Sequence, residues 1–129
     1  MNQNKRFYDL KAEQYAKEWY ANQTMLPTIK DFISLFSIKT PSILDLGCGP
    51  GHESKRLKEN GAKVVGIDYS SESIKIARKN NPEIDFFEMD YLCITKSLGL
   101  FDGIFSCSSL IHLQENELVT VIEKVNEVL

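Results

Sequence analysis

The hydrophobic pattern of the chain changes near residue 41. Before that point, apolar residues recur three or four positions apart and predict two amphipathic helices. The first helix is expected over residues 5–21. The second begins near Pro27, which suits the first turn of a helix, and ends before Pro41, because a residue that precedes proline disfavours the helical conformation. Residues 1–40 are therefore expected to form a helical N-terminal segment.

From residue 42 onward, short apolar runs alternate with helical segments. The runs predict four strands, at residues 42–46, 63–68, 84–89 and 101–107. The segments that follow predict helices at residues 52–60, 71–79 and from 115 onward, and a loop with a helical turn at 91–100. Ser70 is the expected N-cap of the second of these helices. Repeated strand–helix units of this length imply a parallel sheet with right-handed crossovers and helices on both faces.

Four parallel strands leave one or both edges of the sheet without a partner strand. We therefore expect the domain to be incomplete at its C-terminal end. The uncovered edge of the fourth strand is expected to be masked by association with a second copy of the chain, because an open edge beside apolar surface rarely stays solvated. Residues 1–40 and a core at 41–129 would together form one domain of 129 residues.

Composition and charge exclude several classes of protein. Hydrophobic residues make up 43% of the chain and charged residues 26%, which is typical of a globular domain. The formal net charge of -3 favours neither nucleic acid nor an anionic membrane as a partner. No apolar run approaches the roughly 20 residues of a membrane-spanning helix. The three cysteines lack the spacing of a disulfide framework or a zinc site, so we expect a reduced, cytoplasmic protein without a metal.

The most specific local feature is the glycine-rich turn DLGCGPG at residues 45–51, which follows the first strand. Glycines let a ligand lie against bare backbone, and the helix that follows offers unpaired N–H groups and the positive end of its dipole. This combination predicts a nucleotide-sized site at the carboxyl end of a strand. A dinucleotide fingerprint has glycine at its sixth position, where this chain has His52, because its third glycine falls one place early at Gly51. The spacing therefore disfavours a pyrophosphate.

Residues 45–51 resemble the first motif of the class I S-adenosylmethionine-dependent methyltransferases, and the agreement continues in register. The later segments that carry the resemblance are Gly66–Ser70, Met89–Tyr91 and Phe101–Cys107, together with Phe7–Asp9, Ala12 and Tyr15, which resemble the N-terminal helix of the small-molecule branch. The resemblance covers residues 7–129. It implies a Rossmann-like three-layer α/β/α fold with a mostly parallel sheet, and S-adenosylmethionine as the cofactor.

The resemblance also implies roles for the residues at the first two strand ends. Asp45, with the backbone of the glycine turn at Gly47, Cys48 and Gly49, would face the methionine amino group; the alternative for Asp45 is a buried carboxylate that caps the turn. Asp68 would accept hydrogen bonds from both ribose hydroxyls, as an acid at this position does in dinucleotide-binding proteins. The alternative for Asp68 is the N-cap of the next helix.

The adenine is expected near the second and third strand ends. Asp90 would accept a hydrogen bond from the adenine amino group, with the N–H of Tyr91 facing a ring nitrogen; a solvated loop acid is the alternative for Asp90. Tyr69 either packs against the adenine or is an ordinary core or surface tyrosine.

The sulfonium centre is cationic, so aromatic faces and carbonyl oxygens should line it. Tyr8 and Tyr15 on the first helix and the carbonyl of Cys107 are the candidates. The two tyrosines also fit a packing stripe with Trp19, which is the competing interpretation.

His112 is the candidate catalytic residue, because it lies just beyond the fourth strand and could deprotonate an acceptor. The competing interpretation is a structural histidine at the start of the last helix, since in-line methyl transfer chiefly requires alignment and desolvation. His52 is expected on the surface, at a helix N-terminus.

The function that these features favour is S-adenosylmethionine-dependent methyl transfer to a small molecule, with oxygen, nitrogen, sulfur and carbon acceptors all open. A non-catalytic fragment that binds the cofactor or a partner is the first alternative. A nicotinamide-binding oxidoreductase domain is the second, and both the glycine spacing and the lack of a Tyr-x-x-x-Lys motif disfavour it.

Overall fold

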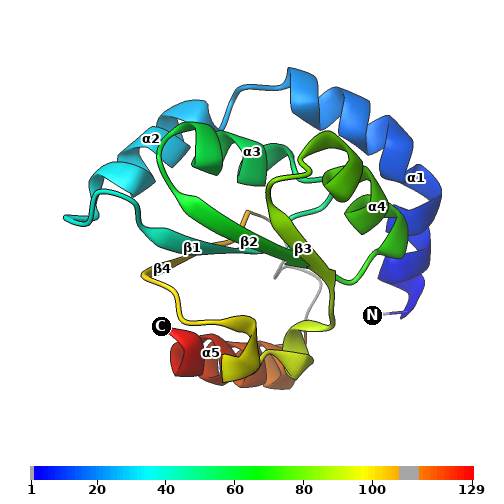
Figure 1. The fold of residues 1–129 in the computed structure, drawn as a ribbon. Coiled ribbons are helices and arrows are strands. Elements are labelled where there is room, and N and C mark those ends of the chain that lie inside the picture. Colours follow the sequence, from blue (N-terminus) through cyan, green and yellow to red (C-terminus); the bar gives the residue numbers. More distant parts are fainter. Residues whose placement is uncertain (1, 108–113) are drawn as a thin grey trace.

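The computed structural model describes residues 2–107 and 114–129, and Figure 1 shows a sheet between two layers of helices. The strands are β1 (Ser42–Leu46), β2 (Lys63–Asp68), β3 (Asp85–Glu88) and β4 (Gly103–Phe105). The helices are α1 (Asn2–Ala21), α2 (Leu26–Ser34), α3 (His52–Glu59), α4 (Ser71–Asn80) and α5 (Glu115–Val128), with 3₁₀ turns η1 (Tyr91–Cys93) and η2 (Lys96–Leu98). Among the described residues, no helix is both long and apolar enough to cross a membrane.

The sheet is parallel throughout, in the order β3-β2-β1-β4, which confirms the expected Rossmann-like α/β/α fold. Helices α1 to α4 lie over one face, and α5 with the two 3₁₀ turns lies over the other (Figure 1). In the described part of the chain, β3 and β4 are edge strands with a partner on one side. The expectation of unpaired edges agrees with this order.

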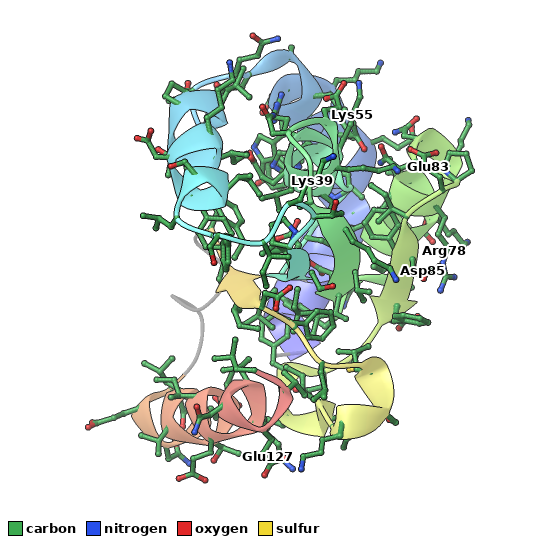
Figure 2. All side chains as sticks on the ribbon, turned by 60° about the vertical axis from the view of Figure 1, so that its left-hand side comes forward. Lys39, Lys55, Arg78, Glu83, Asp85 and Glu127 are labelled. Atoms are coloured by element: carbon green, nitrogen blue, oxygen red, sulfur yellow. The ribbon has the colours of Figure 1, made fainter. Side chains whose placement is uncertain are left out.

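Strand β1 is central and buried on both faces, as a strand in a covered parallel sheet should be. Ile43 joins the hydrophobic cluster under α2, α3 and α4, whereas Leu44 and Leu46 join the cluster under α5. Because side chains alternate along a strand, Asp45 shares the face of Ile43 and points toward α3. Asp45 is thereby placed under a helix. By contrast, charged residues such as Lys55, Glu83 and Glu127 lie on the outside of the molecule (Figure 2).

Two elements, α2 and β4, are clearly shorter than expected, and some other boundaries differ by one to three residues. Helix α2 ends at Ser34, well before Pro41, because the N–H groups of Leu35 and Phe36 bond to carbonyls three residues back and close the helix with a 3₁₀ turn. Strand β4 has three residues, fewer than the expected seven. Ser70 is confirmed as the cap of α4, since its side chain accepts a hydrogen bond from the Ser73 N–H.

Candidate functional site

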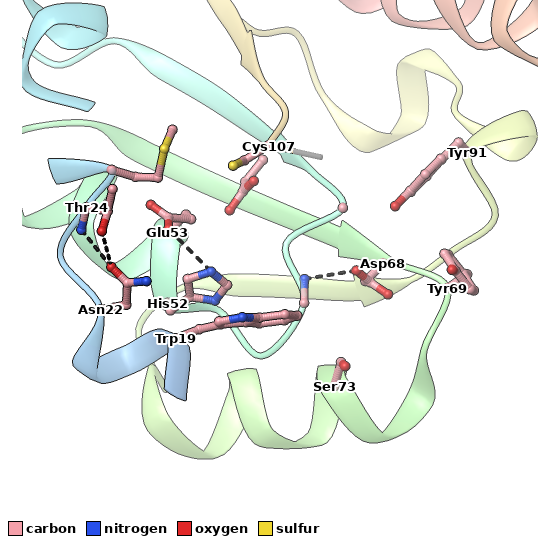
Figure 3. A pocket seen from close by; sticks show the side chains of 14 residues that line it. Trp19, Asn22, Thr24, His52, Glu53, Asp68, Tyr69, Ser73, Tyr91 and Cys107 are labelled. Carbon is pink, nitrogen blue, oxygen red and sulfur yellow. Dashed lines mark hydrogen bonds and ion pairs between the residues drawn. The ribbon is translucent and has the colours of Figure 1, made fainter. Parts of the chain in front are cut away.

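A cavity of about 260 Å³ lies at the carboxyl ends of the strands, beneath the C-terminal end of α1 (Figure 3). Residues that follow each of the four strands line it, together with residues from α1 and the segment before α2. The lining residues are Trp19, Asn22, Thr24, Met25, Asp45, Gly47, Gly49, His52, Glu53, Asp68, Tyr69, Ser73, Tyr91 and Cys107. The strand order reverses between β1 and β4, and such a switch point is where open α/β sheets bind ligands.

The glycine turn forms the floor of this cavity. Gly47, Gly49 and Gly51 have φ values of 80°, 54° and 90°, which side-chain-bearing residues rarely adopt. A Cβ atom on Gly49 would lie 3.4 Å from the Trp19 ring. The bare backbone therefore lets the indole of Trp19 lie directly over the turn.

Asp45 lies at the base of the cavity, on the C-terminal part of β1. Its side chain is 2% exposed, and its Oδ2 accepts a hydrogen bond of 2.6 Å from Ser54 Oγ. The pKa of Asp45 is raised from 3.8 to about 7, chiefly by burial; the Ser54 hydrogen bond opposes the rise, and the nearby carboxylates of Glu53 and Asp68 contribute to it. A cationic group in the cavity would therefore favour the ionised form of Asp45.

Asp68 ends β2 and holds the neighbouring turn in place. Its Oδ2 accepts a hydrogen bond of 2.9 Å from the Gly49 N–H, and its Oδ1 accepts one of 2.9 Å from the Ser70 N–H. The alternative role of capping α4 falls to Ser70, as described above. Asp68 thus lines the cavity while it orients the glycine turn.

Two tyrosines mark one end of the cavity. Tyr69 and Tyr91 are both buried, and their ring centroids lie 6.0 Å apart at an interplanar angle of 80°. Asp90 lies next to them in the sequence but is not among the lining residues; its Oδ1 accepts a hydrogen bond from the Leu92 N–H and caps η1. The opposite end of the cavity is formed by Asn22, Thr24 and Glu53 (Figure 3).

The structure brings seven of the predicted site residues together around the cavity: Asp45, Gly47, Gly49, Asp68, Tyr69, Tyr91 and Cys107. Cys48, Tyr15 and Asp90 are not part of the lining. The Cys48 side chain packs into the core under α3 and α4, and Tyr15 stacks on Trp19 with 4.7 Å between ring centroids. His112 and the side chain of Tyr8 lie outside the described residues, so their roles remain predictions.

The sequence did not identify His52 as a residue of the cavity lining, and the expected surface position of its side chain was wrong. His52 is the first residue of α3, but its ring lies 5.1 Å from the Trp19 ring and 6.1 Å from the Tyr20 ring, centroid to centroid. Burial, and to a smaller extent the Arg56 guanidinium, lower the pKa of His52 from 6.5 to about 4. His52 is therefore neutral at pH 7, and its Nε2, 3.3 Å from Glu53 Oε1, makes a polar contact rather than an ion pair.

The end of α1 is fixed to the core by hydrogen bonds. Arg56 Nη2 donates to the carbonyl oxygens of Trp19 and Tyr20 at 3.1 and 2.9 Å. Tyr20 Oη donates to the Pro50 carbonyl at 2.6 Å and accepts from Asn81 Nδ2 at 2.8 Å. The Arg56 bonds satisfy two of the last carbonyls of α1, and together with the Tyr20 bonds they hold Trp19 over the cavity.

The charge of the lining is one-sided. Three carboxylates line the cavity, from Asp45, Glu53 and Asp68, and none of the lining residues in the described part of the chain is Lys or Arg. Burial raises the pKa of Asp45 and Glu53, and Glu53 pairs with Arg56, but the lining still offers carboxylate acceptors and no cationic side chain among its described residues, which favours a cation over a phosphate group. The geometry therefore suits a ligand that is positively charged and carries no phosphate.

Comparison with known proteins agrees with this architecture. The methyltransferase domain family matches residues 43–129. The ubiquinone biosynthesis O-methyltransferase of Chromobacterium violaceum (strain ATCC 12472) is 29% identical over 123 residues, covering 84% of this chain and 53% of that protein. The enzyme of the same name from Coxiella burnetii (strain Dugway 5J108-111) is 36% identical over 81 residues, covering 59% of this chain and 34% of that protein.

Among solved structures, the magnesium protoporphyrin IX methyltransferase (ChlM) from Synechocystis PCC 6803 with bound SAM has a similar fold. Its TM-score is 0.70 at 22% identity, covering 82% of this chain and 53% of that chain. Fold and cavity thus define an α/β protein with a ligand site at its strand ends. More particularly, the chain belongs to the methyltransferase domain family. The matches cover between about a third and a half of the length of the two curated relatives.

Proposed function

We propose that this chain binds S-adenosylmethionine and serves methyl transfer to a small-molecule acceptor by in-line displacement. The observation that carries the proposal is the acidic lining of the cavity, with three carboxylates and no Lys or Arg among the described lining residues. S-adenosylmethionine bears a sulfonium and an ammonium group and no phosphate, so it complements this lining. Family membership and a fold relative that was crystallised with bound SAM support the same cofactor.

Each end of the cavity suits a different part of this cofactor. The rings of Tyr69 and Tyr91 offer apolar surface for the adenine, and Asp68 offers a carboxylate at the end of β2 for the ribose hydroxyls. Asp45 and the backbone of Gly47 are the proposed contacts of the ammonium group. Cys107, after β4, lies on the side of the cavity opposite Trp19 (Figure 3).

When bound, the cofactor supplies an electrophilic methyl group on its sulfonium sulfur. The contribution of this chain is to hold that ligand under Trp19, away from water, so that an acceptor can approach in line. We also infer that residues 1–40 and 41–129 work as one domain, because Trp19 and Asp45 line the same cavity. The cytoplasmic location that we propose fits three cysteines that form no disulfide in the described part of the chain.

Isothermal titration calorimetry tests this function. S-adenosylmethionine and S-adenosylhomocysteine are expected to bind with one-to-one stoichiometry, and NAD⁺ is expected to give no heat of binding. Binding of NAD⁺ alone would contradict the proposal and favour an oxidoreductase domain. Release of S-adenosylhomocysteine in the presence of an acceptor panel then separates an enzyme from a non-catalytic binding module.

A further inference from the structure

Glu53 carries a buried carboxylate oxygen that the proposed cofactor contacts leave unused. The residue is 6% exposed and lines the cavity. Its Oε1 lies 3.3 Å from His52 Nε2 and 3.4 Å from Arg56 Nη1. Its Oε2 is buried and has no hydrogen-bond partner among the described residues. Such an atom costs free energy in the protein alone, so a donor from a ligand would be stabilising there.

His52 presents a second acceptor at the same end of the cavity. The His52 Nε2 lies 3.3 Å from Glu53 Oε1, so we assign the proton of the neutral ring to Nε2, which leaves Nδ1 as an acceptor. His52 Nδ1 is also buried without a partner in the described part of the chain. The Trp19 indole beside it adds an aromatic face, which attracts cations.

The positive charge nearby does not fully compensate Glu53. Arg56 Nη2 donates hydrogen bonds to the carbonyl oxygens of Trp19 and Tyr20, and its Nη1 donates one of 3.4 Å to Glu53 Oε1, which leaves Glu53 Oε2 without a partner among the described residues. Burial raises the pKa of Glu53, and the Glu53 carboxylate in turn raises the pKa of Asp45. A cation at this end of the cavity would favour the ionised form of both groups and could donate to Glu53 Oε2.

We propose that Glu53 and His52 form a subsite for an alkylammonium group, at the end of the cavity away from Tyr69 and Tyr91. The subsite rests on the proposed function, and two sources would present this chemistry to it. One is the amino-acid end of the cofactor, and the other is an amine on the methyl acceptor. Glu53 acts in either case by accepting an N–H bond at Oε2.

The variant Glu53→Gln removes the charge and keeps the size of the side chain. Its matched control is Glu59→Gln, which removes an exposed charge from the same helix. Calorimetry compares S-adenosylhomocysteine, which has the ammonium group, with 5′-methylthioadenosine, which has the nucleoside and thioether without the amino acid. A third probe is propylammonium chloride, added to protein saturated with S-adenosylhomocysteine and followed by backbone amide NMR shifts.

If the cofactor supplies the ammonium, Glu53→Gln lowers the affinity for S-adenosylhomocysteine at least about tenfold and the affinity for 5′-methylthioadenosine less than about twofold. If the acceptor supplies it, nucleoside affinities are unchanged and propylammonium binding is lost in Glu53→Gln but kept in Glu59→Gln. Equal weakening of both nucleosides, or no effect on any probe, overturns the subsite.

Two controls distinguish a failure of the subsite proposal from a misfolded variant and from a failure of the proposed function. Binding of 5′-methylthioadenosine to Glu53→Gln shows that the variant has folded; should it fail to fold, Glu53→Asp, which keeps the charge and withdraws the oxygen, replaces it. For Glu53→Asp the same selective weakening of S-adenosylhomocysteine or propylammonium is expected, and its absence overturns the subsite. A wild-type protein that binds neither nucleoside contradicts the proposed function itself.

Discussion

Replacing Asp45 with asparagine should stabilise the protein at neutral pH while it weakens ligand binding. Asp45 is 2% exposed and shares the cavity with two other carboxylates, so its negative charge is held in an unfavourable place. Asparagine keeps an oxygen that can accept the hydrogen bond from Ser54 Oγ, and it has no charge to desolvate. The substitution therefore removes the free-energy cost of burying the charge and keeps the shape of the side chain.

The size and sign of the effect follow from the pKa of Asp45. The fold raises this pKa from 3.8 to about 7, so the native state holds the proton more tightly than the unfolded chain. The contribution of the protonated Asp45 carboxyl to the free energy of unfolding is fully present below about pH 4 and is lost as the pH rises through about 7. The difference corresponds to roughly 4 kcal/mol as an upper bound. Asp45→Asn should thus match the wild type near pH 4 and exceed it by up to roughly that amount at pH 8.

Urea denaturation at a series of pH values between 4 and 8 measures this difference. The exposed Asp31→Asn control should change the free energy of unfolding by less than about 0.5 kcal/mol across the series. Calorimetry at pH 8 should show weaker binding of S-adenosylhomocysteine to Asp45→Asn, because the ionised carboxylate faces the ammonium group in our proposal. A stability difference that does not vary with pH would refute the reasoning.

Three further predictions concern other parts of the molecule. Asp68→Ala should weaken S-adenosylhomocysteine binding by roughly 1.5–3 kcal/mol in calorimetry, through loss of charged hydrogen bonds, and unchanged affinity would restrict Asp68 to holding the turn. Gly66→Ala should cost about 1–3 kcal/mol in urea denaturation, because its Cβ would lie 2.6 Å from the Phe86 ring. Adding Phe86→Leu should recover part of that loss, and a lack of recovery would rule out the clash. The open edge of β4 should promote self-association in sedimentation velocity, whereas a strictly monomeric profile at high concentration would count against it.

The strands and the glycine turn were predictable because their signals are local. The alternation of apolar runs and amphipathic segments sets the order of the elements, and an acid at the end of a parallel strand points to the ligand edge of the sheet whatever surrounds it. Asp68 was identified in this way, and Asp45 through the resemblance of the glycine motif; both line the cavity. Asp90 carried the same signal, but its Oδ1 accepts a hydrogen bond from the N–H of Leu92, and the residue is not among those that line the cavity.

The other end of the cavity could not be predicted, because it depends on contacts between distant segments. The surface position expected for His52 assumed an open helix N-terminus, and α1 covers that end through the bonds from Arg56 to Trp19 and Tyr20. Trp19 had a place in the apolar stripe of the first helix, but the stripe alone does not say that its last aromatic ring lies over the glycine turn. The burial of Glu53 follows from the same packing.

A crystal structure of the complex with S-adenosylhomocysteine tests the central claim most directly. The account predicts the adenine at Tyr69 and Tyr91, the ribose hydroxyls on Asp68, and the amino-acid end beneath Trp19 near Asp45. A ligand bound elsewhere, or carboxylates of Asp45 and Asp68 that face away from it, would contradict the claim that an acidic cavity at the strand ends selects this cofactor.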